Sequence, residues 1–333
     1  MIQLLKRAVS AGKFKIEIRT KKVVRIFNKI ESMKNLALGF AIIFFLFSCG
    51  NSSRKSSLQN SKSQKILEEK KSVQFPTWQE RTLILPNTPE IPIEQNLAKN
   101  DVPFAGIVSH HLLAYKFIDE WFFELYEHNP KIKTFIVLSP SHWNLSRADF
   151  SLTSGAWNCD GTFLETDKKI QKIFLEKLDG KIEDDVFLYE HGVSAIAPFI
   201  AKYFPKSKIV AVAYDAESPV NTKIANRLSS ALKPFVAKKD FFILISSDFS
   251  HHHDIEKTKQ NDNVSRKFFA DPNRATWQFA LCDNPVAMYA LTHATKENFR
   301  AIIQRNTNSF EISRQDEDDI TSYFFCYFVK KKE

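Results

Sequence analysis

The 333-residue sequence lacks the features that define several classes of protein. Its four cysteines are too few and too scattered for a disulfide framework, and they form no Cys-x-x-Cys pair. Glycine is scarce, with 8 residues, whereas phenylalanine is abundant, with 30. This balance excludes a collagen-like or linker-dominated chain and predicts a well-packed interior. The sequence also shows no internal repeat.

The positive charge is concentrated at the front of the chain. The formal net charge is +9, but Met1–Ser32 alone holds nine Lys or Arg residues against two Glu residues. From Cys49 onward the net charge is only +1. Because nucleic-acid binding depends on clustered positive charge, we expect no nucleic-acid partner for the globular part.

An apolar run from Leu36 to Phe47 ends at Ser48-Cys49-Gly50. About a dozen apolar residues are too few for a transmembrane helix, which needs roughly 20, but they suit a signal peptide. The pattern is similar to a bacterial lipoprotein signal, with residues 33–48 as the signal peptide and Cys49 as the lipidated residue. Phe47 is bulkier than is usual there, and a plain signal anchor or a chance apolar patch remains open.

Residues 1–32 are either a basic extension or an upstream mis-assigned start, since Met33 offers a start of its own. Residues 49–74 are polar and predict a disordered tether. Residues 75–100 are richer in proline and apolar residues and predict an extended arm around the domain. Residues 101–333 are expected to form one folded domain. We therefore expect a lipoprotein of the cell envelope, outside the cytoplasm, whose lipid anchor makes the membrane its partner.

From Asp101 onward, short apolar runs alternate with longer amphipathic runs. The short runs predict strands at Ala105–Ser109, Thr134–Leu138, Lys208–Tyr214 and Phe241–Ser246, and a closing strand at Thr321–Lys330. The longer runs predict helices at Leu112–His128, Asp167–Leu178, Val193–Tyr203 and Val220–Val236. This alternation predicts an α/β fold with a mainly parallel central sheet flanked by helices.

Histidines follow several of the predicted strands directly. His110, His142 and His251 come after the first, second and fourth strands, and His191 precedes a helix start. Ligands of open α/β sheets bind beyond the carboxyl ends of the strands, and imidazole is the commonest metal ligand. A single such histidine would more often be structural, but several at one sheet edge predict a metal site. For His252 and His253 a solvated loop is the better interpretation.

Five ordered motifs resemble those of the Memo-like family, also called AmmeMemoRadiSam system protein B. The family shares its fold with class III extradiol ring-cleaving dioxygenases. The motifs, over about Val102 to Val329, are Ile107-Val108-Ser109-His110, Ser139-Pro140-Ser141-His142, Glu190-His191-Gly192, Ser246-Ser247-Asp248-Phe249-Ser250-His251, and Cys282 before Asp283-Asn284-Pro285. In this chain Ser109 replaces the family's proline, Ser139 its glycine and Gly192 its serine, so a relative's substrate does not transfer.

The resemblance implies His110, His142 and Cys282 as metal ligands. It implies His191, Asp248 and His251 as catalytic acid, base or supporting groups. With a cysteine ligand the site favours a divalent metal ion, iron first and copper or zinc as alternatives, and departs from the dioxygenase pattern.

Three hypotheses about function remain open at this point. The first is a non-haem metal-dependent oxidoreductase, dioxygenase-like, that acts on an unknown small organic molecule. The second is a non-catalytic metal-binding lipoprotein, and the third is a partner-binding lipoprotein that retains the pocket. Fold does not decide between them, and the sequence names no protein partner.

Overall fold

The computed structural model describes residues 73–77, 88–295 and 298–331. The chain divides into two compact units, Met1–Glu68 and Glu69–Glu333, and the described residues belong to the second. The expected basic extension, signal peptide, Cys49 lipidation site and nearly all of the tether lie outside the described residues. Within the described ranges, no helix has both the length and the apolarity needed to cross a membrane.

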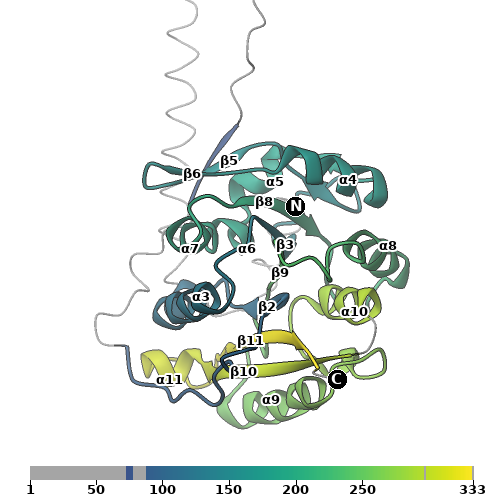
Figure 1. Cartoon of the computed structure of the whole chain (residues 1–333). Helices are drawn as coiled ribbons and strands as arrows, with labels where there is room; N and C mark the ends of the chain where they lie inside the picture. Colours follow the sequence, from purple (N-terminus) through teal and green to yellow (C-terminus); the bar gives the residue numbers. More distant parts are fainter. Residues whose placement is uncertain (1–72, 78–87, 296–297, 332–333) are drawn as a thin grey trace, which may run out of the picture. The chain divides into compact units, whose positions relative to one another are not determined.

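The centre of the fold is an eight-stranded sheet (Figure 1). Its middle strands β2, β9, β3 and β8 run parallel, and β10 and β11 add antiparallel strands at one edge. At the other edge β4 pairs antiparallel with β8 and parallel with β7. In spatial order the strands are β10 (Phe299–Asn308), β11 (Ser322–Lys330), β2 (Ala105–Val108), β9 (Phe241–Ser246), β3 (Thr134–Pro140), β8 (Lys208–Tyr214), β4 (Ser151–Leu152) and β7 (Lys181–Ile182).

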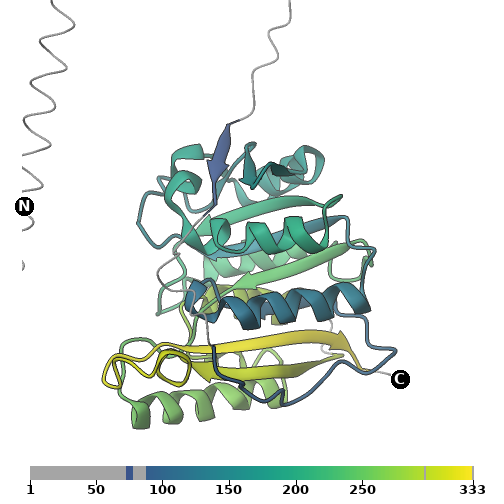
Figure 2. The same ribbon diagram turned by 90° about the vertical axis from the view of Figure 1, so that its left-hand side faces the viewer.

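Helices cover both faces of this sheet (Figures 1 and 2). Alternate side chains of the buried strands point to opposite faces, so Val137 and Leu244 join one apolar core while Ile136 and Ile243 join the other. The first core is closed by α3 (Tyr115–His128), α5 (Asp184–Tyr189), α6 (His191–Ser194) and α7 (Ala197–Tyr203). The second is closed by α4 (Lys168–Leu178), α8 (Thr222–Leu232), α9 (Ile255–Ala270) and α10 (Pro285–Ala294).

A second, three-stranded sheet joins β1 (Gln74–Pro76), β5 (Ala156–Cys159) and β6 (Thr162–Glu165). In it, Phe75 is 1% exposed and its ring lies 5.1 Å from that of Trp157. Further along the segment expected to be an arm, the backbone NH of Glu94 donates to the carbonyl of Gln304 at 2.8 Å. The described parts of this segment therefore contact the domain. The remaining elements are the short helix α11 (Ser309–Ser313) and the 3-10 turns η1 (Leu112–Ala114) and η2 (Trp277–Phe279).

The predicted α/β class and parallel central strands are confirmed, and β8 and β9 have the predicted bounds. The predicted helix Val193–Tyr203 is wrong as one element, because α6 ends at Ser194 and α7 starts at Ala197. The cause is Pro198, whose ring lacks an NH group and favours the first turn of a new helix. The sequence also gave no sign of α9 or β10, whose buried positions include many polar residues.

Candidate metal site

The first histidine of the site follows β2. His110 is 3% exposed, and its Nδ1 lies 2.9 Å from the hydroxyl of Ser246, the last residue of β9. β2 and β9 are parallel neighbours, so their carboxyl ends bring the two residues together. The contact fixes the ring through Nδ1, and Nε2 lies 3.7 Å and 3.4 Å from carboxylate oxygens of Asp248 and Asp283.

The second histidine follows β3 and is held by a buried carboxylate. His142 Nδ1 lies 2.7 Å from Oε1 of Glu190, and the backbone NH of His142 donates to Oε2 at 2.9 Å. Glu190 is 1% exposed and also accepts from the backbone NH of Gly192 at the start of α6. A carboxylate on one ring nitrogen is the usual way in which proteins orient a metal-binding histidine. It leaves Nε2 of His142 to face the site.

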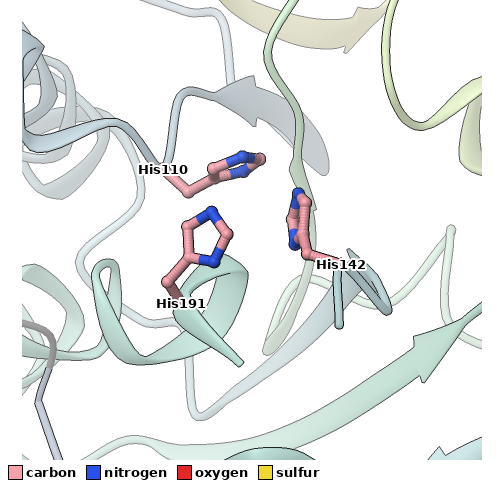
Figure 3. Close-up of side chains that lie close together, drawn as sticks. All are labelled: His110, His142 and His191. Atoms are coloured by element: carbon pink, nitrogen blue, oxygen red, sulfur yellow. The ribbon is translucent and has the colours of Figure 1, made fainter. Parts of the chain in front are cut away.

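The third histidine, His191, is the first residue of α6. Its ring centroid lies 4.2 Å from that of His142 and 5.0 Å from that of His110, and the other two centroids are 4.7 Å apart. One nitrogen from each ring falls within 4.8 Å of the others. The three rings, contributed by separate segments, face a common point (Figure 3).

Two aspartates, the buried Asp248 and the half-buried Asp283, border the same point. Oδ2 of Asp283 lies 3.4 Å from Nε2 of His110 and 3.6 Å from Nε2 of His142. Oδ2 of Asp248 lies 3.7 Å from Nε2 of His110. Among the described residues, His142 Nε2, Asp283 Oδ2 and Asp248 Oδ1 are buried and have no hydrogen-bond partner. Buried polar atoms normally have a partner, so this set of atoms is suited to a bound cation.

The surroundings also shift the pKa values of these groups. Burial, reinforced by the neighbouring histidines, places the pKa of His110 well below its usual value and lowers that of His191 to about 4. Burial acts in the same direction on His142, but Asp283 and Glu190 outweigh it and raise its pKa to about 10. Burial and the nearby Asp283 raise the pKa of Asp248. Two of the three imidazoles are therefore neutral at physiological pH, the form that binds a metal.

The other predicted site residues, Cys282 and His251, lie beside the histidines. Both line a cavity of about 460 Å³ together with His142 and Asp283. Burial raises the pKa of the Cys282 thiol to about 12 and lowers the pKa of His251. The structure groups His110 and His142 with His191, not with Cys282. Ligation by Cys282 and proton transfer by His191, Asp248 and His251 stay predictions.

The sequence reasoning missed Asp283 and Glu190 as members of the site. Asp283 directly follows Cys282, and the metal-ligand prediction stopped one residue before it. Glu190 was noted only as part of the motif around His191, although it holds His142. A carboxylate adjacent to a candidate ligand was the available signal in both cases.

Two of the departures from the family pattern meet at the wall of the site. A Cβ atom on Gly192 would lie 2.3 Å from the hydroxyl oxygen of Ser139 and 3.3 Å from Cε1 of His142. Non-bonded carbon and oxygen atoms do not approach so closely, so the Ser139 hydroxyl occupies the space that a larger residue at 192 would need. We therefore expect the serine at 139 and the glycine at 192 to compensate each other.

Comparison with known proteins agrees with the motifs. The model of the family described as Memo-like protein matches residues 111–310. A MEMO1 family protein from Pyrobaculum aerophilum is 26% identical over 151 residues, which cover 44% of this chain and 53% of the relative. Another MEMO1 family protein, from Metallosphaera sedula, is 24% identical over 241 residues, which cover 68% of this chain and 81% of the relative.

The match to the Pyrobaculum aerophilum protein spans about half of that relative's length. A solved structure of an uncharacterised protein from Escherichia coli K12 shares 12% identity at a TM-score of 0.44 and covers 66% of this chain and 98% of that one. A similarity this low carries no argument. The family match covers more than half of the chain, and this chain belongs to the Memo-like protein family.

Proposed function

We propose that this protein binds a divalent metal ion through His110, His142 and His191. One observation carries the proposal: three imidazoles from separate segments converge with donor nitrogens within 4.8 Å of one another. A cation at the common point would give these closely spaced donor nitrogens a shared partner. The ring of His142 is already oriented by Glu190 as a metal ligand would be.

The donor set favours a transition metal. Neutral imidazoles suit iron, copper and zinc, and buried carboxylates beside them add the negative charge that a dication needs. Iron is our first choice, with copper and zinc as alternatives. Three protein ligands leave coordination positions open, as catalytic metal sites require.

We further propose a redox enzyme that acts on a small organic molecule. The cavity of about 460 Å³ beside His142 is large enough for such a molecule. When bound, the metal would supply Lewis-acid or one-electron chemistry. His251 lines the cavity, and its lowered pKa lets the neutral ring accept a proton from a bound molecule. Asp248, beside His110, is the second group placed to hold a proton.

A non-catalytic role in binding metal at the cell envelope is the second candidate. The lipoprotein-like pattern that ends at Cys49 favours it, because a surface anchor suits a protein that captures ions. Oxygen uptake with phenols or thiols would support the enzyme, whereas reversible metal binding without turnover would support the second candidate.

The anchor has its own test. Replacing Cys49 with alanine should move the protein from the detergent phase to the aqueous phase and abolish fatty-acid labelling, because no other cysteine follows a signal-like run. Cys326→Ala is the control, since that thiol is buried in the domain. Unchanged partitioning of Cys49→Ala would refute the anchor.

The metal proposal is tested by elemental analysis of the purified full chain. Wild type should hold close to one equivalent of metal, and His110→Ala, His142→Ala and His191→Ala should each lose most of it. His128→Ala is the matched control, since its ring contacts the carbonyl of Asp101 and does not belong to the group of three histidines. Metal retained in all three site variants would refute the proposal.

A further inference from the structure

We infer that Asp283 supplies the anionic ligand of the metal site, in the place that the family resemblance gives to Cys282. The inference rests on the proposed metal-binding function and adds the identity of the fourth protein ligand. It makes the donor set of this chain three imidazoles and a carboxylate, without sulfur.

The distances around Asp283 are those of a metal-binding group. Two ligands that each lie about 2.1 Å from one ion, at the tetrahedral angle, are about 3.4 Å apart. Oδ2 of Asp283 lies 3.4 Å from Nε2 of His110 and 3.6 Å from Nε2 of His142. Both separations exceed a normal hydrogen bond, so the contacts are loose polar contacts with room between the atoms.

The protein orients the carboxylate with its other oxygen. Oδ1 of Asp283 accepts a hydrogen bond from the Ser247 hydroxyl at 2.8 Å and from the backbone NH of Asp248 at 3.1 Å. Oδ2 is buried and has no hydrogen-bond partner among the described residues. A carboxylate held through one oxygen, with the other directed at two histidines, is already placed as a monodentate ligand.

The start of α10 fixes the backbone of this segment. Asn284 caps the helix through the NH of Ala287, and its amide donates to the carbonyls of Leu138 and Ser246. Those carbonyls lie at the ends of β3 and β9, next to the two strand-end histidines. Asp283 is therefore tied to the strand ends that position His110 and His142.

Cys282 occupies a different position. Its backbone forms a bridge with Phe249, and its thiol lies within hydrogen-bonding reach of Ser247. It lines the cavity beside the site and a neighbouring one of about 640 Å³ that also contains His253 and Trp277. Both residues line the cavity beside His142, but it is the Asp283 carboxylate that lies 3.4 Å and 3.6 Å from the Nε2 atoms of His110 and His142.

The inference is tested with cobalt(II) bound to the metal-stripped full chain. A cysteine ligand gives an intense sulfur-to-cobalt charge-transfer band in the near ultraviolet. Wild type should bind cobalt without that band, and Cys282→Ser should bind it with unchanged affinity. Asp283→Asn should bind more weakly by about 100-fold or more, beyond what losing an outer partner of a ligand costs.

The matched control is Asp215→Asn, an exposed aspartate on the wall of the same cavity, which should bind cobalt like wild type. A charge-transfer band in wild type, or loss of cobalt in Cys282→Ser, would overturn the inference while leaving the metal site intact. Equal affinity in Asp283→Asn and Asp215→Asn would also overturn it. Wild type that binds no cobalt would instead refute the metal-binding function itself. The wild-type spectrum decides between the two ligands even if Asp283→Asn fails to fold.

Discussion

Two clusters of buried and half-buried polar residues differ in how their hydrogen-bonding groups are satisfied. The strand-end cluster consists of His110, His142, His191, Asp248 and Asp283. The α9 cluster consists of Asp262, Arg266, Asn306 and Ser322, between α9 and the antiparallel strands β10 and β11.

The polar groups of the α9 cluster have partners within the cluster and in the neighbouring Glu94. Asp262 accepts from the Ser322 hydroxyl at 2.6 Å and from the Asn306 amide at 3.1 Å. Arg266 donates to Asn306 and forms a bidentate pair with Glu94. In the strand-end cluster, by contrast, buried atoms of His142, Asp248 and Asp283 have no partner in the described part of the chain. A polar cluster whose hydrogen-bonding groups all have protein partners stabilises the fold. A cluster with unpartnered polar atoms is suited to binding a ligand.

The largest predicted effect concerns pH and the α9 cluster. Burial raises the pKa of Asp262 to about 6, above the usual value near 4. Its stabilising contribution is therefore complete below about pH 4 and is lost as pH rises through about 6, a change of about 3 kcal/mol. Asp262→Asn should remove this dependence, as measured by urea unfolding across that pH range. Parallel curves for wild type and Asp262→Asn would show that the cluster does not act this way.

The next effect tests how tightly the wall beside the strand-end cluster is packed. Gly192→Ser should destabilise the protein by about 1–3 kcal/mol, because its Cβ would meet Ser139. Adding Ser139→Gly should recover most of that loss, and a double-mutant cycle by thermal unfolding measures the coupling. If the two substitutions are simply additive, the serine and the glycine do not compensate each other.

The smallest effect compares two fully buried serines: Ser246, which contacts His110 of the strand-end cluster, and Ser322 of the α9 cluster. Ser246→Ala removes the hydroxyl that holds His110 and should weaken metal binding by about 10- to 100-fold. Ser322→Ala removes the donor to Asp262 and should lower stability by about 1–3 kcal/mol with metal affinity unchanged. Calorimetric metal titration and thermal unfolding of both variants give the comparison. Equal losses of metal affinity in the two variants would contradict the proposal that only the strand-end cluster binds metal.

The same two regions differ in how well the sequence predicts them. The parallel strands are predictable because their apolar runs are continuous, and the histidines directly after them are visible as a group. The helix α9 is not, because its buried positions include Thr258, Asn261 and Asp262, which periodicity assigns to solvent.

The identity of the metal ligands cannot be predicted from the spacing of residues along the chain. Whether Cys282 or Asp283 faces the histidines depends on how Asn284 anchors the start of α10, which spacing along the chain does not encode. Compensation between Ser139 and Gly192 likewise links two motifs far apart in sequence. Only the folded backbone brings them into contact.

The most direct test of the metal site is an anomalous-scattering map from crystals of the metal-loaded protein, recorded at the absorption edge of the metal. The account predicts one strong peak at about 2.1 Å from Nε2 of His110, Nε2 of His142 and Oδ2 of Asp283, and next to the ring of His191. A map with no peak at the strand ends, from crystals shown to contain metal, would contradict it.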